Sequence, residues 1–328
     1  MSLPPLYPLK FTPILKPTLW GGRKLRSRLH KPLPEDELIG ESWEISGVKD
    51  NISEVANGPL AGQSLVTLLE DYRGALLGEQ VYARFGADFP LLVKFIDANQ
   101  DLSIQVHPDD TLARQRHNSF GKTEMWYVID AEPGATLISG FNRPTSREEY
   151  QAYFQRGQLL DLLNREQVAP DDVFFLPAGR VHTIGRGLLI AEIQQTSDIT
   201  YRIYDFDRVD KAGNKRQLHV EEALAAIDFS FYTDYKTAYD KQATTAELAA
   251  CRYFICNRIL AGQPVTRNYK HTGSFVILIF LHGQGTLECA QGNFAYTTGD
   301  TWLLPACTNE ITLVPRQPGK VLEVYLPS

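Results

Sequence analysis

The sequence has little of what would assign it to a membrane, to a disulfide framework or to nucleic acid. It has only four cysteines in 328 residues, all in the last third, and no Cys-x-x-Cys pair. Neither a zinc knuckle nor a disulfide framework is therefore indicated. The longest apolar run, residues 275–281, is far shorter than the roughly 20 residues of a membrane helix. The first residues also lack the basic start and apolar stretch of a signal peptide, so we expect a cytoplasmic protein.

The charge balance narrows the range of partners further. The formal net charge is -6, and no run of lysine or arginine stands out. This argues against a nucleic-acid surface. An anionic small molecule remains compatible with the sequence, because binding it needs only two or three local cations. We therefore expect a small-molecule substrate and a monomer or weak dimer.

Most of the chain consists of short apolar runs with period-two alternation, broken by Gly, Pro and Asp. Runs of this length, rich in β-branched and aromatic residues, predict strands. The clearest are residues 124–130, 173–176, 188–193, 275–281 and 321–326. Helical patterns are fewer: residues 64–71 begin with Ser64 as a candidate N-cap, residues 146–164 begin with a Ser146/Glu149 capping box, and residues 220–227 form a third. A mainly β fold is predicted.

An internal repeat predicts the architecture. Residues 172–182 (DVFFLPAGRVH) align with residues 300–310 (DTWLLPACTNE): each has a turn Asp, a four-residue strand and Pro-Ala. This form predicts two cupin-type jelly-roll β-barrels, with a few helices packed beside the first. Gly283 and Gly285 are expected to form a hairpin turn in the second copy. The polar, Tyr-rich residues 229–244 separate the copies, giving a metal-binding domain at 1–235 and a metal-free domain at 236–328.

Three segments together suggest a metal site. On a strand, Ser103, Gln105 and His107 would share one face, backed by apolar residues on the other. Glu124 opens the next strand, and His182 ends the first copy of the repeat. Each residue alone has an ordinary structural explanation. Together, two imidazoles and one carboxylate form an open site that suits zinc, Fe(II), manganese or cobalt. Gln105 would be either a fourth ligand or a group that orients His107.

Seven stretches resemble the type I mannose-6-phosphate isomerase (phosphomannose isomerase) family of the cupin superfamily, in its short bacterial form. They are WGG at 20–22, GESWEI at 40–45, PLLVKF at 90–95, LSIQVHP at 102–108, GKTEMW at 121–126, PAGRVH at 177–182 and SDITYR at 197–202. The resemblance implies one divalent metal, zinc, surrounded by Gln105, His107, Glu124 and His182, and it implies that Arg202 and Lys122 belong to the active site. Many relatives carry a Tyr where Ile184 stands and an Asp where Leu19 stands, so a proton relay through either is not expected.

The implied reaction interconverts mannose 6-phosphate and fructose 6-phosphate through an enediol. Lys122 is the first acid/base candidate and Glu192 the second, while the Arg202 guanidinium would stabilise negative charge. No P-loop pattern occurs, so Lys94, on a strand that should be buried, and Ser103 are the phosphate candidates. Two other classes fit a cupin with these ligands: an Fe(II)-dependent oxygenase and a non-catalytic sugar-binding protein.

Overall fold

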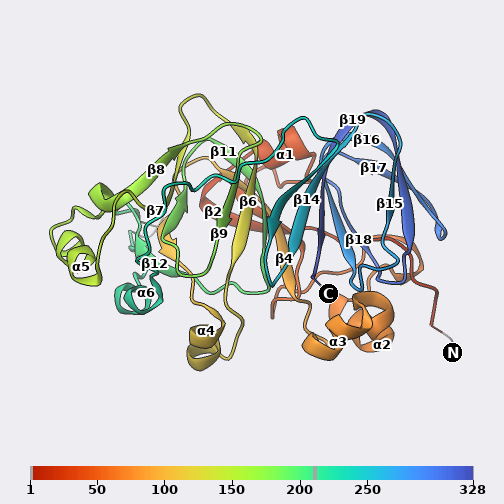
Figure 1. Ribbon diagram of the computed structural model, residues 1–328, viewed down its shortest axis with the longest axis horizontal. Coiled ribbons are helices and arrows are strands. Elements are labelled where there is room, and N and C mark those ends of the chain that lie inside the picture. Colours follow the sequence, from red (N-terminus) through yellow and green to blue (C-terminus); the bar gives the residue numbers. More distant parts are fainter. Residues whose placement is uncertain (1–2, 210–212, 328) are drawn as a thin grey trace.

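The computed structural model describes residues 3–209 and 213–327, which form three antiparallel sheets and six α-helices (Figure 1). In spatial order, the six-stranded sheet contains β2 (Ile14–Gly22), β3 (Ile39–Ile45), β4 (Leu91–Ala98), β11 (Leu188–Gln195), β6 (Glu124–Ala131) and β9 (Val173–Leu176). The five-stranded sheet contains β12 (Tyr201–Tyr204), β5 (Ile104–Val106), β10 (His182–Ile184), β7 (Thr136–Phe141) and β8 (Leu163–Gln167). The prediction of a mainly β protein is confirmed.

The C-terminal part forms the third sheet, of eight strands. Its main path runs β1 (Leu9–Lys10), β18 (Thr301–Leu304), β16 (Val276–Cys289), β19 (Glu310–Tyr325), β14 (Ile255–Ala261) and β13 (Thr245–Ala250); β15 (Val265–Asn268) pairs with β19 and β17 (Gly292–Thr297) with β16. Strand β1, near the N-terminus, thus pairs with β18, from which it is separated by almost the whole sequence. The division at residue 235 stays a prediction.

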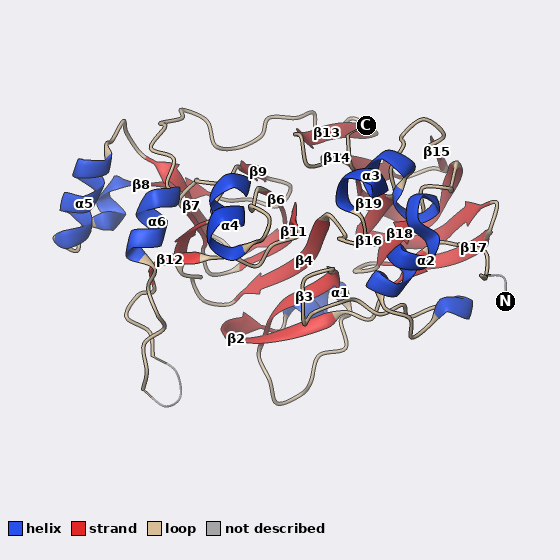
Figure 2. Ribbon diagram, turned by 90° about the horizontal axis from the view of Figure 1, so that it is seen from below, coloured by secondary structure: helices blue, strands red, loops and turns tan. Residues whose placement is uncertain are grey.

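Helices lie at both ends of the molecule, beside the five-stranded sheet and beside the C-terminal sheet (Figure 2). They are α1 (Lys24–Leu29), α2 (Leu65–Leu77), α3 (Glu79–Phe85), α4 (Asp110–His117), α5 (Arg147–Gln155) and α6 (Val220–Ala226), with 3-10 turns at Gly58–Leu60 and Leu159–Leu162. The expectation that the helices pack beside the first copy is wrong for α2 and α3. The carbonyls of Leu76 and Leu77 accept hydrogen bonds from Ala306 and Phe275 of the C-terminal part. No helix in the described ranges is long and apolar enough to span a bilayer.

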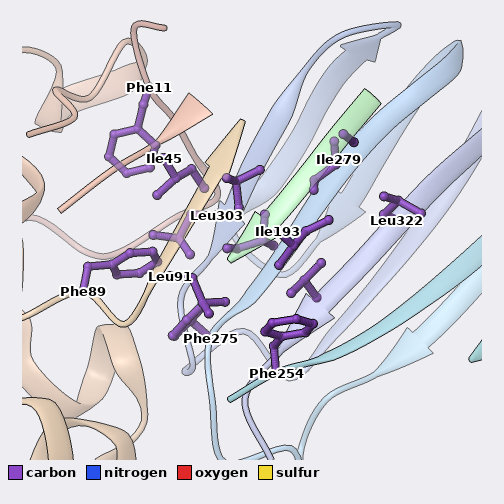
Figure 3. Packing of buried hydrophobic residues seen from close by; sticks show 14 of the residues in the cluster. Phe11, Ile45, Phe89, Leu91, Ile193, Phe254, Phe275, Ile279, Leu303 and Leu322 are labelled. Carbon is purple, nitrogen blue, oxygen red and sulfur yellow. The ribbon is translucent and has the colours of Figure 1, made fainter. Parts of the chain in front are cut away.

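The predicted barrels are not closed. Each of the three sheets ends in edge strands in the described part of the chain, and the first copy consists of two separate sheets rather than one continuous ring. The six-stranded sheet is instead a middle layer. One of its faces packs on the C-terminal sheet, where Ile45, Leu91 and Ile193 meet Ile279 and Leu303 (Figure 3). The opposite face is directed toward the five-stranded sheet, and because both faces are covered, every residue of β4 and β11 is buried.

The internal repeat is confirmed in its hydrogen bonds. The Asp172 carboxylate accepts from the Ala169 N–H, and the Asp300 carboxylate accepts in the same way from Thr297, each at 3.0 Å. A four-residue strand follows each aspartate. In the turn after each strand, the carbonyl of the proline accepts a hydrogen bond from the N–H three residues later: Pro177 in the first segment and Pro305 in the second. The two segments are therefore equivalent in geometry as well as in sequence.

Two local expectations need correction. The helix that starts after Ser146 ends at Gln155 rather than at residue 164, because Gly157 takes a φ of +68° that a helix does not allow. Gly283 forms no hairpin turn. It lies inside β16 at a φ of +95°, between shifts in the pairing with β19, and so it supplies a bulge that bends the strand. Ser64 and Ser146 do cap their helices as expected.

The two glycines of the WGG motif allow strand β2 to lie unusually close to its neighbours in the six-stranded sheet. A Cβ on Gly21 would lie 2.5 Å from the backbone nitrogen of Gly40, and one on Gly22 would lie 2.5 Å from the Asp97 carboxylate. Strands β2 and β3 can pack this tightly only because these side chains are missing. The approach brings Trp20, on β2, and Trp43, on β3, to the same cavity.

Candidate active site

A cavity of about 240 Å³ opens between the six-stranded and five-stranded sheets. It collects most of the residues that the sequence singled out. Lys94, Ser103, Gln105, Lys122, Glu192 and Arg202 all line it, and His107, Glu124 and His182 form a buried cluster next to Lys122 and Gln105. The structure therefore brings together all nine predicted site residues.

Strand register explains this assembly. In the five-stranded sheet, Gln105 on β5 lies directly opposite His182 on β10 and opposite Arg202 on β12. In the six-stranded sheet, Lys94 on β4 stands opposite Glu192 on β11 and opposite Trp43 on β3. Each sheet thus contributes one row of polar side chains, and the two rows face a common space.

The two histidines and Glu124 form the most deeply buried part of the site. Nε2 of His107 lies 3.6 Å from one oxygen of Glu124, and Nε2 of His182 lies 3.3 Å from the other. All three residues are at most 1% exposed. Among the described residues neither carboxylate oxygen has a hydrogen-bond partner, and an ion pair between Oε2 and Lys122 offsets only part of the cost of burying this anion.

The orientation of the rings suits a metal ion. Nδ1 of His107 donates to the carbonyl of Ile199, and Nδ1 of His182 donates to the carbonyl of Arg180. Both Nε2 atoms therefore carry a lone pair, and both are directed toward Glu124. Burial lowers the pKa of His182 to about 4 and holds the pKa of His107 well below its usual value, with the Lys122 charge contributing in each case. Two neutral imidazoles and a carboxylate with no hydrogen bond form a donor set that a divalent cation satisfies.

Gln105 and Lys122 complete the surroundings of the two rings. The Gln105 amide nitrogen lies 3.3 Å from Nε2 of His182, and the Lys122 ammonium lies 3.1 Å from Nε2 of His107. Lys122 is also 3.1 Å from Glu124 Oε2. Nε2 of each histidine therefore contacts a polar side chain.

The buried lysine on β4 is neutralised by carboxylates. The Lys94 ammonium lies 3.4 Å from Glu41 and 3.4 Å from Glu192, and 4.8 Å above the ring of Trp43. Burial would lower the pKa of Lys94, but the two carboxylates outweigh it and raise the pKa. Burial raises the pKa of Glu192, and the nearby Glu124 charge raises it further. Glu192 is therefore the carboxyl group of the cavity whose burial favours holding a proton.

The sequence argument did not name five of the polar and aromatic residues of the cavity wall as site residues. These are Trp20, Glu41, Trp43, Asp198 and Arg216. Glu41 and Trp43 alternate on β3 within the GESWEI stretch, so period-two alternation could have found them. Arg216 lies in an irregular segment after β12, and no sequence pattern marks it.

Fold and site together define a β protein with a buried His–Glu–His cluster, able to hold a metal ion, next to a charged cavity. The family description "Phosphomannose isomerase type I, catalytic domain" matches residues 9–134. The chain is 36% identical to the mannose-6-phosphate isomerase ManA of Bacillus subtilis over 314 residues, covering 93% of this chain and 95% of that protein. It is 35% identical to the mannose-6-phosphate isomerase of Streptococcus mutans over 289 residues, covering 88% and 89%.

The crystal structure of the mannose 6-phosphate isomerase from Bacillus subtilis superimposes with a TM-score of 0.87 at 31% identity, covering 97% of this chain and 99% of that one. The chain belongs to the type I phosphomannose isomerase family.

Proposed function

We propose that this chain interconverts mannose 6-phosphate and fructose 6-phosphate, the activity named for its relatives in Bacillus subtilis and Streptococcus mutans. The observation that carries the proposal is the buried His107–Glu124–His182 cluster beside a cavity lined by cationic side chains. An aldose–ketose isomerase needs stabilisation of a developing oxyanion and a proton carrier within reach of two neighbouring carbons. The cavity places candidates for both side by side.

We propose zinc as the metal, held by His107, Glu124 and His182 with Gln105 as the fourth protein group. When bound, the ion supplies Lewis acidity toward the substrate oxygens. The two carbonyl-anchored rings support this assignment, since their tautomers leave Nε2 available. We further propose that residues 1–235 and 236–328 are two cupin-type units, an interpretation that the repeated Asp-turn geometry supports.

The residues around the metal site suit proton transfer. We assign Lys122 as the first candidate to move the proton between C1 and C2, since its ammonium lies within 3.1 Å of two members of the cluster. Glu192 is the second candidate, because its burial favours a protonated carboxyl group. The Arg202 guanidinium, on β12, would stabilise negative charge on the enediol, and it keeps its proton throughout.

Substrate binding divides between the two polar rows. Lys94 and Glu192 contact each other in the six-stranded sheet, and we propose that they bind hydroxyl groups of the sugar. A phosphate dianion would be repelled by the carboxylates on both sides of Lys94, so this lysine fits a hydroxyl better than the phosphate predicted for it. Ser103, at the end of the cavity next to β5, remains a phosphate ligand in the proposal.

A coupled assay with mannose 6-phosphate tests the proposal. The protein should turn over substrate as purified, lose activity when a chelator removes the metal, and recover it when zinc is restored. Equal activity of the metal-free and metal-loaded protein would contradict the assignment of the metal. Absence of turnover in the fully loaded protein would contradict the function itself.

The reaction in heavy water tests the enediol. Proton transfer through a group that exchanges with solvent should place deuterium at C2 of the aldose or C1 of the ketose. A product without any solvent deuterium would favour a hydride shift instead.

A further inference from the structure

The segment that follows β12 folds back onto Arg202. Nη1 of Arg202 donates to the carbonyl of Gln217 at 2.8 Å, and its backbone N–H donates to Nδ1 of His219 at 3.2 Å. The N–H of His219 returns a hydrogen bond to the carbonyl of Arg202. These three contacts fix the segment against β12 and place the neighbouring residue, Arg216, in the wall of the cavity.

Arg216 is held in place by an acidic residue outside the cavity. Its Nε donates to one oxygen of Asp205 at 2.7 Å, and its Nη2 contacts the other. Asp205 also contacts Arg208, whose guanidinium bonds to the carbonyl of Asp101. Two guanidinium groups, those of Arg208 and Arg216, therefore pair with one carboxylate. This arrangement leaves positive charge in excess beside the cavity.

The two lysines of the cavity are each paired with carboxylates. Lys94 lies between Glu41 and Glu192, and Lys122 lies against Glu124. Arg202 has no carboxylate within ion-pair distance among the described residues, and its buried Nε has no hydrogen-bond partner there. Arg202 and Arg216 line the same cavity, where burial and the charge of Arg216 both lower the pKa of Arg202. Two adjacent cations are stabilised by an anion bound between them.

We propose that Arg216 is a substrate-binding residue that, together with Arg202, holds the phosphate group and makes the enzyme select phosphorylated over free sugars. The inference rests on the proposed function. Ser103, in the wall of the same cavity, offers a hydroxyl to the same group. Phosphate is dianionic near neutral pH, and guanidinium groups bind it through pairs of parallel hydrogen bonds. The Nε–Nη2 edge of Arg216 is used by Asp205, which orients the remaining Nη1 side.

The test compares Arg216→Ala with Arg216→Lys and a matched control. Lys215→Ala removes the same charge from the preceding residue, whose exposed ammonium pairs with Asp207 instead of lining the cavity. Arg216→Ala should raise the KM for mannose 6-phosphate by about 10- to 100-fold, the loss typical of a hydrogen bond to a charged group, with a much smaller effect on kcat. Arg216→Lys should recover part of the loss, and Lys215→Ala should behave like the unchanged protein.

Direct binding of inorganic phosphate separates this inference from the proposed function. Calorimetric titration of the metal-loaded protein should show phosphate binding that Arg216→Ala weakens by a factor similar to the change in KM, while Lys215→Ala preserves it. Unchanged phosphate affinity in Arg216→Ala, or a loss confined to kcat, would overturn the role of Arg216. If the unchanged protein binds phosphate through Arg216 but does not isomerise mannose 6-phosphate, the proposed function fails and the anion site stands.

Discussion

Replacing Glu124 by Gln changes the charge of the proposed metal site with almost no change in shape. The carboxylate is fully buried at the start of β6, and its oxygens lie 3.1 Å from Lys122 Nζ, 3.3 Å from His182 Nε2 and 3.6 Å from His107 Nε2. Two unit charges 3.1 Å apart interact by about 5 kcal/mol at an effective dielectric constant near 20. Losing one partner of a buried charge pair typically costs about 3–5 kcal/mol.

These magnitudes set the expected loss of metal affinity. A penalty of about 3 kcal/mol or more corresponds to at least roughly 100-fold weaker binding. Because a divalent ion carries twice the charge of the lysine ammonium, it should lose more interaction energy with residue 124 than Lys122 does. The unchanged protein should retain close to one metal ion per chain after gel filtration, as measured by mass spectrometry, and Glu124→Gln should retain far less. Turnover of mannose 6-phosphate should fall in parallel.

Thermal unfolding adds a second measurement. A metal present at about 1,000 times its dissociation constant stabilises the native state by about 4 kcal/mol, which for a chain of this size corresponds to a rise of about 6 °C in Tm. Adding zinc should therefore raise the Tm of the metal-free protein but not that of Glu124→Gln. Full metal content and full turnover in Glu124→Gln would refute the reasoning.

The matched control is Glu44→Gln. Glu44 is also buried on the six-stranded sheet, but it contacts Lys31 at 2.5 Å and Ser42 at 2.6 Å, away from the cavity. The same substitution there should lower the Tm without releasing metal. If both variants lose metal to the same extent, the effect comes from a general weakening of the fold and not from a lost ligand.

Three further perturbations test other parts of the structure. Lys31→Met leaves Glu44 buried without its cation and should lower the free energy of unfolding in urea by about 3–5 kcal/mol, whereas Lys31→Met with Glu44→Leu should recover much of it; equal losses would contradict this. Lys122→Met should keep the metal but lower kcat by about 100-fold or more, and retained turnover would remove Lys122 from proton transfer. Burial would raise the pKa of Asp171, but Lys320 and Tyr127 outweigh it and hold the pKa below 3.8. The contribution of this contact to the free energy of unfolding is thus fully present above the unfolded-state pKa and is lost as the pH falls through the folded-state pKa. Lys320→Met should therefore reduce the dependence of Tm on pH between about pH 2 and 6.

The two copies differ in what surrounds a buried carboxylate at equivalent positions of their sheets. By strand register, Glu323 on β19 is the counterpart of Glu192, and Asn257 on β14 is the counterpart of Lys94. Glu323 is fully buried and is bound by Arg267, Tyr269 and Asn257, so its charge is neutralised by protein groups. A carboxylate at the same place in the sheet is thus structural in one copy, while Glu192 in the other faces a cavity.

The sequence by itself determined what depends on near neighbours in the chain. The strands at 124–131 and 173–176 follow from alternation, the starts of α2 and α5 from Ser64 and Ser146, and the repeat from an Asp that bonds to the N–H three residues earlier. The set of His107, Glu124 and His182 was found because imidazoles and a carboxylate in these motifs have few other uses together. None of these inferences needs to know which strands are adjacent.

Tertiary structure alone decided the rest, because strand order and register involve residues far apart in the chain. Only the pairing of β4 with β3 and β11 places Lys94 between Glu41 and Glu192 and neutralises it. Only the return of the segment after β12 brings Arg216 to the cavity, through hydrogen bonds with Arg202. Sequence periodicity indicates which face of a strand a residue lies on, but the charged groups that surround its side chain come from strands that are neighbours only in space. The sequence therefore specified the cluster proposed to bind the metal, and the packing of the sheets determined which cations of the cavity are left without a carboxylate partner among the described residues.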